Sequence, residues 1–424
     1  MNYNKTLAHI FSRGRFGMKP GLERVTELLS RLGNPQRNLQ TVQIAGTNGK
    51  GSTGAFLSSI MTHAGYRTAF FSSPHLTRFS ERFRINDVEI AEDLLNEAAQ
   101  RVLNAAPEEA TFFELVTAIA LLCFAEEGVD LAVIEAGMGG RSDATNIVQS
   151  LLSIITPISL DHCEYLGWTL SEIAVEKAGI MKQGKPVVIA PQEGVLLKQL
   201  LSAAAESGSP AYAYGRDFHA EAGQRGVSYH AGSFSLPDLK LSLEGRFQAE
   251  NASSAIAAAR LLGEAGFQVT EDAIRKGVAA AVWPGRLELF EGPPRILLDG
   301  AHNPAGAVAL RRSLADYRYD RLILVFGAMA DKSWQETLMQ LLPLADLLVA
   351  VKPAIDRALA ADELSGFGTA RGVKATAAGD VKAGLEYASK IAGPDDLVLV
   401  TGSLFTVGEA RSIITCGTFM PIRG

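Results

Sequence analysis

The stretch from Gln43 to Ile60, QIAGTNGKGSTGAFLSSI, contains a glycine-rich loop with one lysine. The loop GTNGKGS, residues 46–52, follows the short apolar stretch TVQIA and precedes a helical pattern that begins near Ser52. Glycines let backbone N–H groups approach oxyanions, a helix N-terminus adds positive potential, and Lys50 can reach the distal phosphates. The loop therefore predicts a nucleotide phosphate site. The alternative is a glycine-rich turn with a solvated lysine.

The loop departs from the strict phosphate-loop pattern of Gly, four free positions, Gly, Lys and then Ser or Thr. Ile44 stands where the first Gly belongs, and Gly51 follows Lys50 directly. The sequence has no Asn-Lys-x-Asp guanine signature and no strand-terminal Asp-x-x-Gly, which argues against a GTPase switch. The dinucleotide pattern fails as well, because the third Gly of GMGGRS would fall at Ser142.

The elements that would position this loop are strands alternating with helices. Apolar runs rich in Val, Ile and Leu alternate with helical patterns at TVQIA, LAVIEAG, LLSIITPI and KPVVIAP. This alternation, with Gly at the strand ends, is typical of a parallel sheet covered by helices. We predict an α/β fold whose N-terminal domain, residues 1–283, is a parallel-sheet domain like that of P-loop ATPases. Within it, residues 207–243 are predicted to form a small β excursion.

The pattern changes near residue 284, where WPGRLELFEGPPR supplies several Gly and Pro residues. We place a linker at residues 284–295. Strand and helix signals restart at ILLDGAHNPAGAVALRRSL and continue through RLILVFGAM, DLLVAVKP and DLVLVTGSLFTVGEAR. Residues 296–424 are therefore predicted to form a smaller C-terminal α/β domain of Rossmann-like type.

The composition limits the classes of partner. The chain has 424 residues, a formal net charge of -6 and 47% hydrophobic residues, which predicts no general attraction to nucleic acid or to an anionic membrane. The longest apolar run, Leu115 to Ala125, is too short to span a bilayer, so we expect a cytoplasmic protein without membrane partners. Three distant cysteines without a Cys-x-x-Cys pair argue against a disulfide framework or a zinc knuckle.

Charged and polar side chains follow predicted strands in both domains. Glu135 closes the strand LAVI, from where its carboxylate can face the phosphate loop and bind Mg²⁺ directly or through water. The alternative role is a carboxylate that caps nearby backbone. Asp299, His302 and Asn303 follow the strand RILL, at the carboxyl end where open α/β sheets bind ligands.

These motifs together resemble one family. GTNGKGS resembles the loop of the folylpolyglutamate synthase/dihydrofolate synthase family, which is related to the Mur ligases of peptidoglycan synthesis. Mur enzymes usually place Ser or Thr directly after the lysine, and the intervening Gly51 is similar to the folate branch. Further motifs agree in order and spacing over nearly the whole chain: SSPHL at 72–76, TFFE at 111–114, VIEAGMGGRSDATN at 133–146, LDHCEYLG at 160–167, EKAGIMK at 176–182, then WPGRLE, LDGAHNP, GAMADK and TGSLFTVGEAR.

The resemblance implies a ligase of the bacterial bifunctional type, which uses ATP and Mg²⁺ to add L-glutamate to dihydropteroate and to folates. A carboxylate is a poor electrophile, so the γ-phosphoryl of ATP is first transferred to it. The amine of glutamate then attacks the acyl phosphate. Such an enzyme must neutralise two anions held together, a task for Lys50 and bound Mg²⁺. The resemblance also implies a monomer.

Residues of the first domain receive roles from the same resemblance. Ser73 and His162 join Glu135 as metal ligands, although sequence alone also fits a turn before proline and a hydrogen-bonded structural histidine. Lys177 is implied to be carbamylated by CO₂, which requires a neutral amine; the alternative is a surface lysine paired with a neighbouring glutamate. The implied ATP contacts in the loop are Thr47, Asn48, Gly49, Lys50, Gly51 and Ser52. The implied catalytic set is Lys50, His162, Lys177 and Arg286.

The linker and second domain complete the implied nucleotide and glutamate sites. Arg286 would meet the γ-phosphate when the domains close, and Asp299 and His302 would contact ATP. Asn251, in FQAENASSAIAAA, resembles the family's adenine contact, and Ser403, in TGSLF, resembles its glutamate contact. The alternative for both Asn251 and Ser403 is a helix cap.

The segment TRFSERFRIN carries three arginines interleaved with Phe79 and Phe83. An exposed amphipathic strand is one interpretation. The resemblance instead implies a mobile loop beside the pterin, where aromatic rings stack on a flat ligand and arginines bind carboxylates. The implied substrate contacts are Arg78, Arg82, Phe112 and Phe113, with Arg84 in the same segment.

Two other functions stay open. A Mur-type amino-acid ligase acting on a UDP-sugar is disfavoured by Gly51 and by a phosphate loop that begins near residue 46, which leaves little room for an N-terminal UDP-binding domain. A non-ligase nucleotide-binding ATPase module would leave the DGAHNP and TGSLF motifs without a purpose. Within the folate branch, no residue distinguishes a bifunctional enzyme from one that only extends the glutamate tail.

Overall fold

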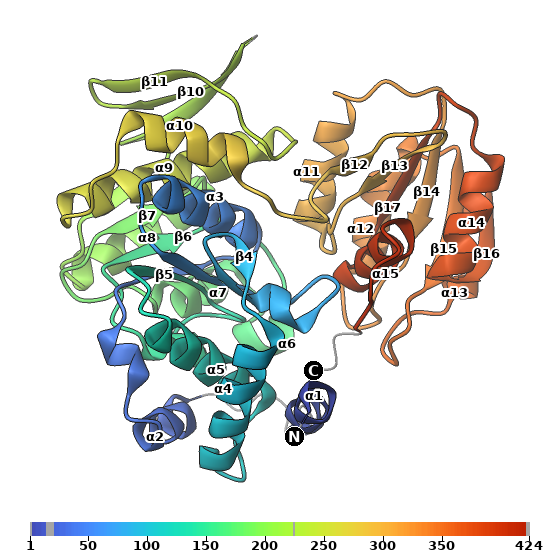
Figure 1. The fold of residues 1–424 in the computed structure, drawn as a ribbon. Helices are drawn as coiled ribbons and strands as arrows, with labels where there is room; N and C mark the ends of the chain where they lie inside the picture. The colour runs from blue at the N-terminus through green and yellow to red at the C-terminus, as the bar shows by residue number, and fades with distance from the viewer. Residues whose placement is uncertain (1, 14–20, 224, 421–424) are drawn as a thin grey trace.

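The computed structural model describes residues 2–13, 21–223 and 225–420, which form two α/β units side by side (Figure 1). The first unit is built on an eight-stranded sheet in the order β4-β3-β2-β5-β1-β6-β7-β8. Its strands are β1 (Thr41–Ala45), β2 (Thr68–Phe71), β3 (Phe83–Ile85), β4 (Val88–Glu89), β5 (Leu131–Glu135), β6 (Leu152–Ile155), β7 (Val187–Ile189) and β8 (Ala211–Ala213).

Six of these strands run parallel, and β3 and β4 extend one edge in antiparallel pairing. The strand β1 is central, and all five of its residues are buried. Because β1 pairs in parallel with β5, the phosphate loop after Ala45 and the carboxylate of Glu135 both lie at the carboxyl ends of the strands, on the same side of the sheet. The topology thus positions the two features that the sequence singled out.

Alternate strand residues face two helical layers. One layer packs on Val42, Ile44 and Val133, and the other packs on Ala45, Ile134 and Ile155. The first layer is α3 (Lys50–His63), α9 (Phe247–Glu264) and α10 (Glu271–Ala280). The second is α1 (Tyr3–Ser12), α2 (Glu23–Arg31), α4 (Glu92–Ala105), α5 (Phe112–Glu126), α7 (Leu170–Ala178) and α8 (Gly194–Glu206), with the short α6 (Cys163–Leu166) nearby.

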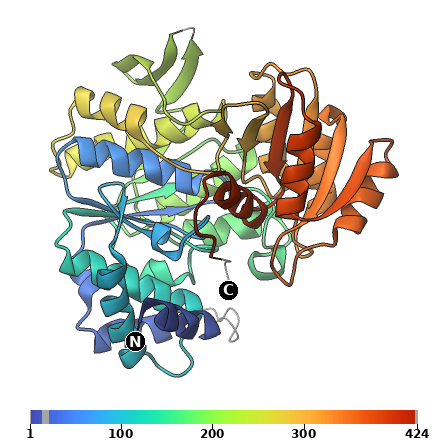
Figure 2. The ribbon, with the colours of Figure 1, turned by 45° about the vertical axis from the view of Figure 1, so that its right-hand side comes forward.

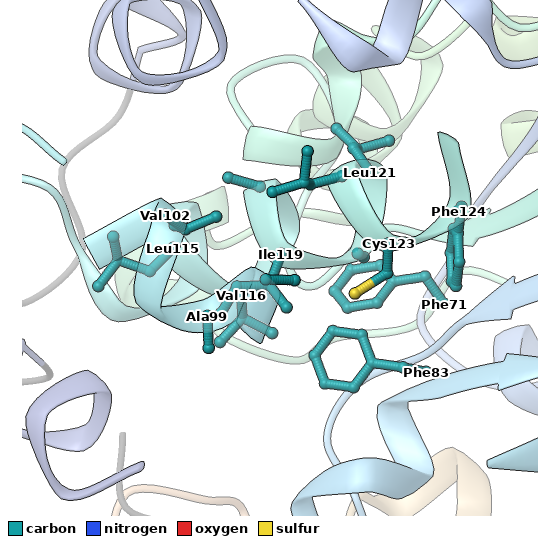
Figure 3. Close-up of a cluster of buried hydrophobic side chains, with 14 of the residues drawn as sticks. Phe71, Phe83, Ala99, Val102, Leu115, Val116, Ile119, Leu121, Cys123 and Phe124 are labelled. Atoms are coloured by element: carbon teal, nitrogen blue, oxygen red, sulfur yellow. The ribbon is translucent and has the colours of Figure 1, made fainter. Parts of the chain in front are cut away.

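Figure 3 shows part of the second layer, where Phe71 and Phe83 from the sheet pack against Val116, Ile119 and Cys123 of α5. The apolar run that includes these α5 residues is therefore a buried core helix. No helix within the described ranges combines the length and the apolar character that crossing a membrane requires.

A small antiparallel sheet lies over α9 and α10 (Figure 1). It contains β9 (His219–Gly223), β10 (Gly226–Ala231) and β11 (Phe234–Leu239) in the order β11-β10-β9. One face of this sheet packs on the core beneath it through the side chains of Tyr229, Leu236 and Leu239. These strands lie within the β excursion predicted at residues 207–243.

The second unit is a six-stranded sheet in the order β12-β13-β17-β14-β15-β16, parallel except for the edge strand β12. One face packs on α11, α12 and α13 and the other on α14 and α15. The strands are β12 (Glu288–Phe290), β13 (Arg295–Leu298), β14 (Leu322–Phe326), β15 (Leu347–Lys352), β16 (Ala375–Asp380) and β17 (Leu397–Thr401). The helices are α11 (Pro304–Leu314), α12 (Trp334–Leu341), α13 (Ala361–Thr369), α14 (Val381–Ile391) and α15 (Leu404–Ile414).

The predicted α/β class, a parallel-sheet unit followed by a smaller α/β unit, is confirmed. The edge strand β12 falls inside the predicted linker at 284–295, and the domain boundaries themselves stay a prediction. Figure 2 shows α15, in dark red, on the side of the second unit that faces the first. The contact there is close, because a Cβ on Gly408 would lie 2.1 Å from the carbonyl oxygen of Leu76.

Candidate active site

A cavity of about 940 Å³ lies between the two units and is lined by residues of both. The first unit contributes the phosphate loop, the ends of β2 and β5, and the start of α5. The second contributes the turns that follow β13 and β17. Parallel strands thus open their carboxyl ends toward one space, where ligands of open α/β sheets bind.

The phosphate loop is closed by its own lysine. Lys50 is the first residue of α3, and its Nζ donates to the carbonyl oxygens of Gly46 at 3.2 Å and Thr47 at 3.3 Å. The same Nζ lies 3.9 Å from Glu135 Oε1. Gly49 has a φ of 86°, and a Cβ there would lie 2.5 Å from Asn251 Oδ1, so both conformation and space require glycine.

Gly51, which stands where the strict pattern has Ser or Thr, lies against the ring of Trp283. A Cβ at position 51 would come within 2.7 Å of the indole. Trp283 stands just before the predicted linker, so the absence of a side chain at position 51 lets the linker approach the phosphate loop. The departure therefore has a packing cause that the loop sequence alone did not reveal.

Gly51→Ser, which places after Lys50 the residue that the strict pattern requires there, is expected to destabilise the protein and weaken ADP binding, because overpacking a tight contact costs about 1–3 kcal/mol. Thermal unfolding and an ADP titration measure the two effects. Gly263→Ala is the matched control, since α9 leaves nothing within 4 Å of its added Cβ. A Gly51→Ser protein as stable as the wild type would show that the Trp283 indole can move aside at no cost in stability.

Glu135 is a buried carboxylate with an unsatisfied oxygen. It is 4% exposed, and among the described residues its Oε2 has no hydrogen-bond partner. Burial raises the pKa of Glu135 to about 7, against the lowering effects of the Lys50 charge and of a hydrogen bond from the backbone of Ser73. A carboxylate oxygen of this kind fits a divalent cation, which would replace the missing partner.

His162 lies in a polar cluster that joins the two units. Its Nε2 is 2.9 Å from Nζ of Lys332, which also lies 2.5 Å from Asp161 Oδ1. Burial and the charge of Lys332 outweigh the nearby Asp161 and lower the pKa of His162 to about 4. The imidazole is therefore neutral at physiological pH, the form that binds metal ions.

Asp161 is the centre of this cluster. His302 Nε2 lies 3.4 Å from its Oδ2. Although burial alone raises the pKa of the Asp161 carboxyl, the hydrogen bond and charge of His302 and the charge of Lys332 hold it well below its ordinary value. The carboxylate therefore stays charged and can hold the two units together.

Lys177 is buried beneath the phosphate loop. It is 3% exposed, and its Nζ donates to the carbonyl oxygen of Gly46 at 2.8 Å. Burial first, and then the charge of Lys50, lower the pKa of Lys177 to about 7. The alternative of a surface lysine paired with a neighbouring glutamate is therefore wrong. Glu172 instead caps the start of α7 through Thr169.

The second unit places its predicted residues on the opposite wall. The Asp299 carboxylate accepts hydrogen bonds from the backbone N–H groups of Ala301 at 2.9 Å and Leu287 at 3.1 Å, and burial raises its pKa. Arg286 and His302 line the same cavity. Gly300 makes room for the arginine, because a Cβ there would lie 2.0 Å from Arg286 Nη1.

Asn48 of the phosphate loop and Asn303 of the second unit form a reciprocal amide pair. Asn48 Nδ2 donates to Asn303 Oδ1 at 3.3 Å, and Asn303 Nδ2 donates to Asn48 Oδ1 at 3.0 Å. Asn303 is also the N-cap of α11 and accepts from the Gly306 N–H. The pair ties the phosphate loop to the first helix of the second unit.

The helix-cap alternatives have different outcomes for Asn251 and Ser403. Asn251 lies inside α9, whose N-cap is Arg246, so the cap interpretation is wrong; its Nδ2 donates to Gln248 Oε1 at 2.9 Å. Ser403 is the N-cap of α15, and its Oγ accepts from the Thr406 N–H at 3.1 Å. Both Asn251 and Ser403 line the cavity, so capping does not remove Ser403 from the site.

The predicted arginines lie in different environments. Arg82 is buried, donates from Nε to His75 Nδ1 at 2.9 Å, and places its guanidinium 5.5 Å from the ring centroid of Phe112. Arg78 does not line the cavity and pairs with Glu89 near the surface. Among the residues of this region that line the cavity are Ser73, Arg82, Arg84, Phe112 and Phe113.

The exposed-strand interpretation of TRFSERFRIN is wrong. The segment forms a 3-10 turn, η3 (Phe79–Arg82), followed by β3, and the rings of Phe79 and Phe83 are both 0% exposed. Further 3-10 turns are η2 (Pro35–Asn38), η4 (Ala144–Ile147) and η5 (Leu342–Leu344). Here η3 breaks the alternation of faces that a continuous strand would give.

Sequence reasoning quoted the motifs around Asp161 and Lys332 without assigning these residues a role, and it missed the contact of Trp283 with the loop. Lys332 comes shortly after the carboxyl end of β14, the same kind of position that identified Asp299. The strand-end rule could therefore have found it. Gln248, whose Nε2 donates to Ser52 Oγ at 3.3 Å, carried no such signal.

Comparison with known families separates the chain into two matches. Residues 44–259 match the model described as "Mur ligase middle domain", and residues 285–404 match "Mur ligase, glutamate ligase domain". A phosphate loop in the first match and a facing α/β unit in the second define the class as a Mur-type ligase.

Relatives that match over nearly their full length identify a family within this class. The chain is 35% identical over 424 residues to a Bacillus subtilis protein named dihydrofolate synthase/folylpolyglutamate synthase, covering 96% of this chain and 98% of that one. The structure of E. coli FolC in complex with DHPP and ADP superposes with a TM-score of 0.90 at 31% identity, covering 97% of this chain and 98% of that chain.

A third comparison is a bifunctional folylpolyglutamate synthase/dihydrofolate synthase with Mn, AMPPNP and L-glutamate bound. It matches with a TM-score of 0.88 at 31% identity and covers 98% of both chains. The chain belongs to the dihydrofolate synthase/folylpolyglutamate synthase family. The resemblance drawn from the sequence motifs is confirmed, and these relatives favour it over a UDP-sugar ligase or a non-ligase ATPase module.

Proposed function

We propose that the protein is an ATP-dependent ligase that joins L-glutamate to the carboxylate of dihydropteroate and of folates through an acyl phosphate. The observation that carries this proposal is the shared cavity, where Lys50 and the unsatisfied carboxylate of Glu135 face residues of the second unit. The relatives support the substrates, because their structures bind DHPP, L-glutamate and ADP or AMPPNP.

The phosphate loop is proposed to hold the ATP phosphates. Lys50 can exchange its two carbonyl contacts for contacts with phosphate oxygens. The N–H groups in the first turn of α3 add hydrogen-bond donors and positive potential. Arg286 brings a second cation from the linker. These cations oppose the charge that would otherwise keep a carboxylate away from the γ-phosphoryl group.

A divalent cation, Mg²⁺ in our proposal, fits at Glu135 together with Ser73 and His162. When bound it would neutralise phosphate charge and orient the transferred group. Lys177 is proposed to react with CO₂: its neutral amine forms an N–C bond to the CO₂ carbon and loses one proton, which leaves an anionic carbamate. The buried position beside the phosphate loop and the lowered pKa support that reaction.

The second unit is proposed to supply the glutamate site and to exclude water. Ser403, at the N-terminus of α15, faces the cavity with a helix end suited to a carboxylate. Closure protects an acyl phosphate from hydrolysis, and the Asn48–Asn303 pair and the Asp161–Lys332 ion pair hold the two units together. We further propose that the protein is a monomer and acts in the cytoplasm.

Lys332→Met is expected to lower kcat/KM for glutamate by about ten- to a hundredfold. Truncating one partner of a fully buried charge pair costs about 2–5 kcal/mol, and this pair is partly buried, so a smaller cost falls on closure. Steady-state kinetics measure the loss, and small-angle scattering with AMPPNP should show a more open molecule. Lys382→Met, at an exposed lysine of the second unit, is the control. Unchanged kinetics and an unchanged radius would remove Lys332 from closure.

The function itself is tested by ADP release from the purified protein with Mg²⁺, ATP and glutamate. Dihydropteroate, a reduced folate, a UDP-muramoyl substrate or no acceptor is supplied in turn. Release with dihydropteroate and with reduced folate, and only when glutamate is present, supports the bifunctional ligase. Release with reduced folate alone would restrict the protein to tail extension. Release without an acceptor, or only with the UDP substrate, would overturn the proposal.

A further inference from the structure

Three potential metal ligands meet on the small antiparallel sheet, outside the cavity described above. His219 and Glu221 belong to β9, and His230 belongs to β10. None of the three lines the cavity between the units. The sheet that carries them lies over α9 and α10, as Figure 1 shows for β10 and β11.

The strand register places the three side chains on one face. His219 pairs directly with His230 across the antiparallel ladder, so their side chains leave the same side of the sheet. Glu221 is two residues beyond His219 and therefore shares that face. The opposite face carries Tyr229, which is buried in the core. The cluster thus stands on a surface whose other side is fixed by packing.

The ligand atoms are already close. His219 Nε2 lies 3.3 Å from Glu221 Oε1, and His230 Nε2 lies 3.9 Å from Glu221 Oε2. One ligand atom from each residue can be chosen so that all three lie within 4.8 Å of one another. Two ligands about 2.0–2.2 Å from a tetrahedral zinc ion lie about 3.3–3.5 Å apart. The His219–Glu221 distance matches that separation. Side-chain rotation can shorten the longer distance between His230 and Glu221.

Surface interactions within the cluster leave part of its bonding capacity unused. The imidazoles of His219 and His230 are stacked, with centroids 5.0 Å apart and an interplanar angle of 20°. Among the described residues, the buried Nε2 of His230 has no hydrogen-bond partner. Glu221 is 68% exposed, so an ion pair with either histidine contributes little to stability. A bound cation would bring both nitrogens and the carboxylate into use at once.

We infer that His219, Glu221 and His230 form a binding site for a divalent transition metal of the zinc type. Two imidazole nitrogens and one carboxylate oxygen select such a metal over Mg²⁺, which prefers oxygen ligands. Three protein ligands leave a fourth position that water can fill. A metal bound there would link β9 to β10, and the site is separate from the Mg²⁺ site proposed in the cavity.

Metal binding to the whole, chelator-treated protein tests the site. Isothermal titration with Zn²⁺ is carried out with ADP and excess Mg²⁺ present, so that the cavity is occupied. Co²⁺ absorption reports whether the bound ion has low, tetrahedral-like coordination. We expect one equivalent of Zn²⁺ bound in the micromolar range or tighter, and an increase in unfolding temperature on zinc addition.

Single variants locate the bound ion. His219→Ala and His230→Ala are each expected to lose the equivalent and the zinc-dependent temperature shift, and Glu221→Gln is expected to weaken binding at least tenfold. His9→Ala, at an exposed histidine of α1, is the control and keeps the equivalent. Glutamate-dependent ADP release should be unchanged in all four variants, which shows that they fold. The inference is overturned if the wild type does not bind zinc. It is also overturned if His219→Ala and His230→Ala bind zinc as tightly as the wild type does.

Discussion

Glu135→Gln is expected to abolish glutamate-dependent ADP release and, at the same time, to make the ligand-free protein harder to unfold above neutral pH. The amide keeps the shape of the side chain but removes the negative charge that a divalent cation needs. Replacing partners outside a metal's coordination sphere already costs about 10- to 100-fold. Loss of a direct ligand should therefore cost at least about a hundredfold in kcat/KM.

The gain in stability follows from the buried charge. Burial raises the pKa of Glu135 from 4.5 to about 7, so between those pH values the native protein holds a proton that the unfolded chain releases. Wild-type stability therefore falls as pH rises through this window, and the cost is fully present above it. Glutamine carries no such cost. The variant should gain up to about 3 kcal/mol above pH 7, at about 1.4 kcal/mol per pKa unit, and nothing below pH 4.5.

Urea unfolding of both proteins across this pH range, without nucleotide or metal, measures the difference. Glu291→Gln, in the exposed turn between β12 and β13, is the matched control, because substitution of an exposed side chain changes stability little. Adding Mg²⁺ with ADP should stabilise the wild type more than Glu135→Gln. A variant that is active, or that is destabilised at pH 8, would contradict the role given to this carboxylate.

Lys177→Met is expected to remove activity by about a hundredfold or more and to remove its dependence on CO₂. Wild-type protein depleted of bicarbonate should lose activity and regain it on bicarbonate addition. The rate of recovery at fixed dissolved CO₂ should rise with pH through about 7 and then level off. Below that pH the lysine is an ammonium ion, which has no lone pair to attack carbon.

Carbon-13 NMR with labelled bicarbonate detects the carbamate directly. The wild type should show a carbamate resonance that Lys177→Met lacks. Lys182→Met is the matched control, because burial also lowers the pKa of Lys182, to about 8, but its Nζ contacts Asn146 and the residue does not line the cavity. Loss of the resonance in the Lys182 variant, or full activity of Lys177→Met, would contradict the carbamylation proposal.

Local patterns predicted the fold because each strand and helix is determined largely by nearby residues. The buried strand β1, the loop that follows it and the start of α3 are consecutive in the chain, and so their arrangement was readable. The carboxyl-end rule likewise brought Glu135 and Asp299 to one edge of their sheets. These predictions needed no knowledge of how the two units face each other.

The contacts that sequence reasoning missed join distant parts of the chain. Asp161 and Lys332 belong to different units and meet only when the units pack together. Arg78 and Arg82 of TRFSERFRIN have equal chemistry, but η3 turns Arg82 into the core and leaves Arg78 at the surface. No periodicity in the sequence marks that turn. Side-chain direction after a break in a strand is a tertiary property, set by the packing of the neighbouring rings.

The packing of α3 has a consequence for synthesis on the ribosome. Gly277 of α10 lies so close to α3 that a Cβ there would come within 2.4 Å of the Ile60 Cα. At about 5–20 residues per second, α10 emerges roughly ten to forty seconds after that part of α3. During this interval the helix that carries the phosphate loop lacks its cover, so the nascent chain exposes an apolar face that chaperones can bind. The ATP site is thus encoded early in the chain but completed late in translation.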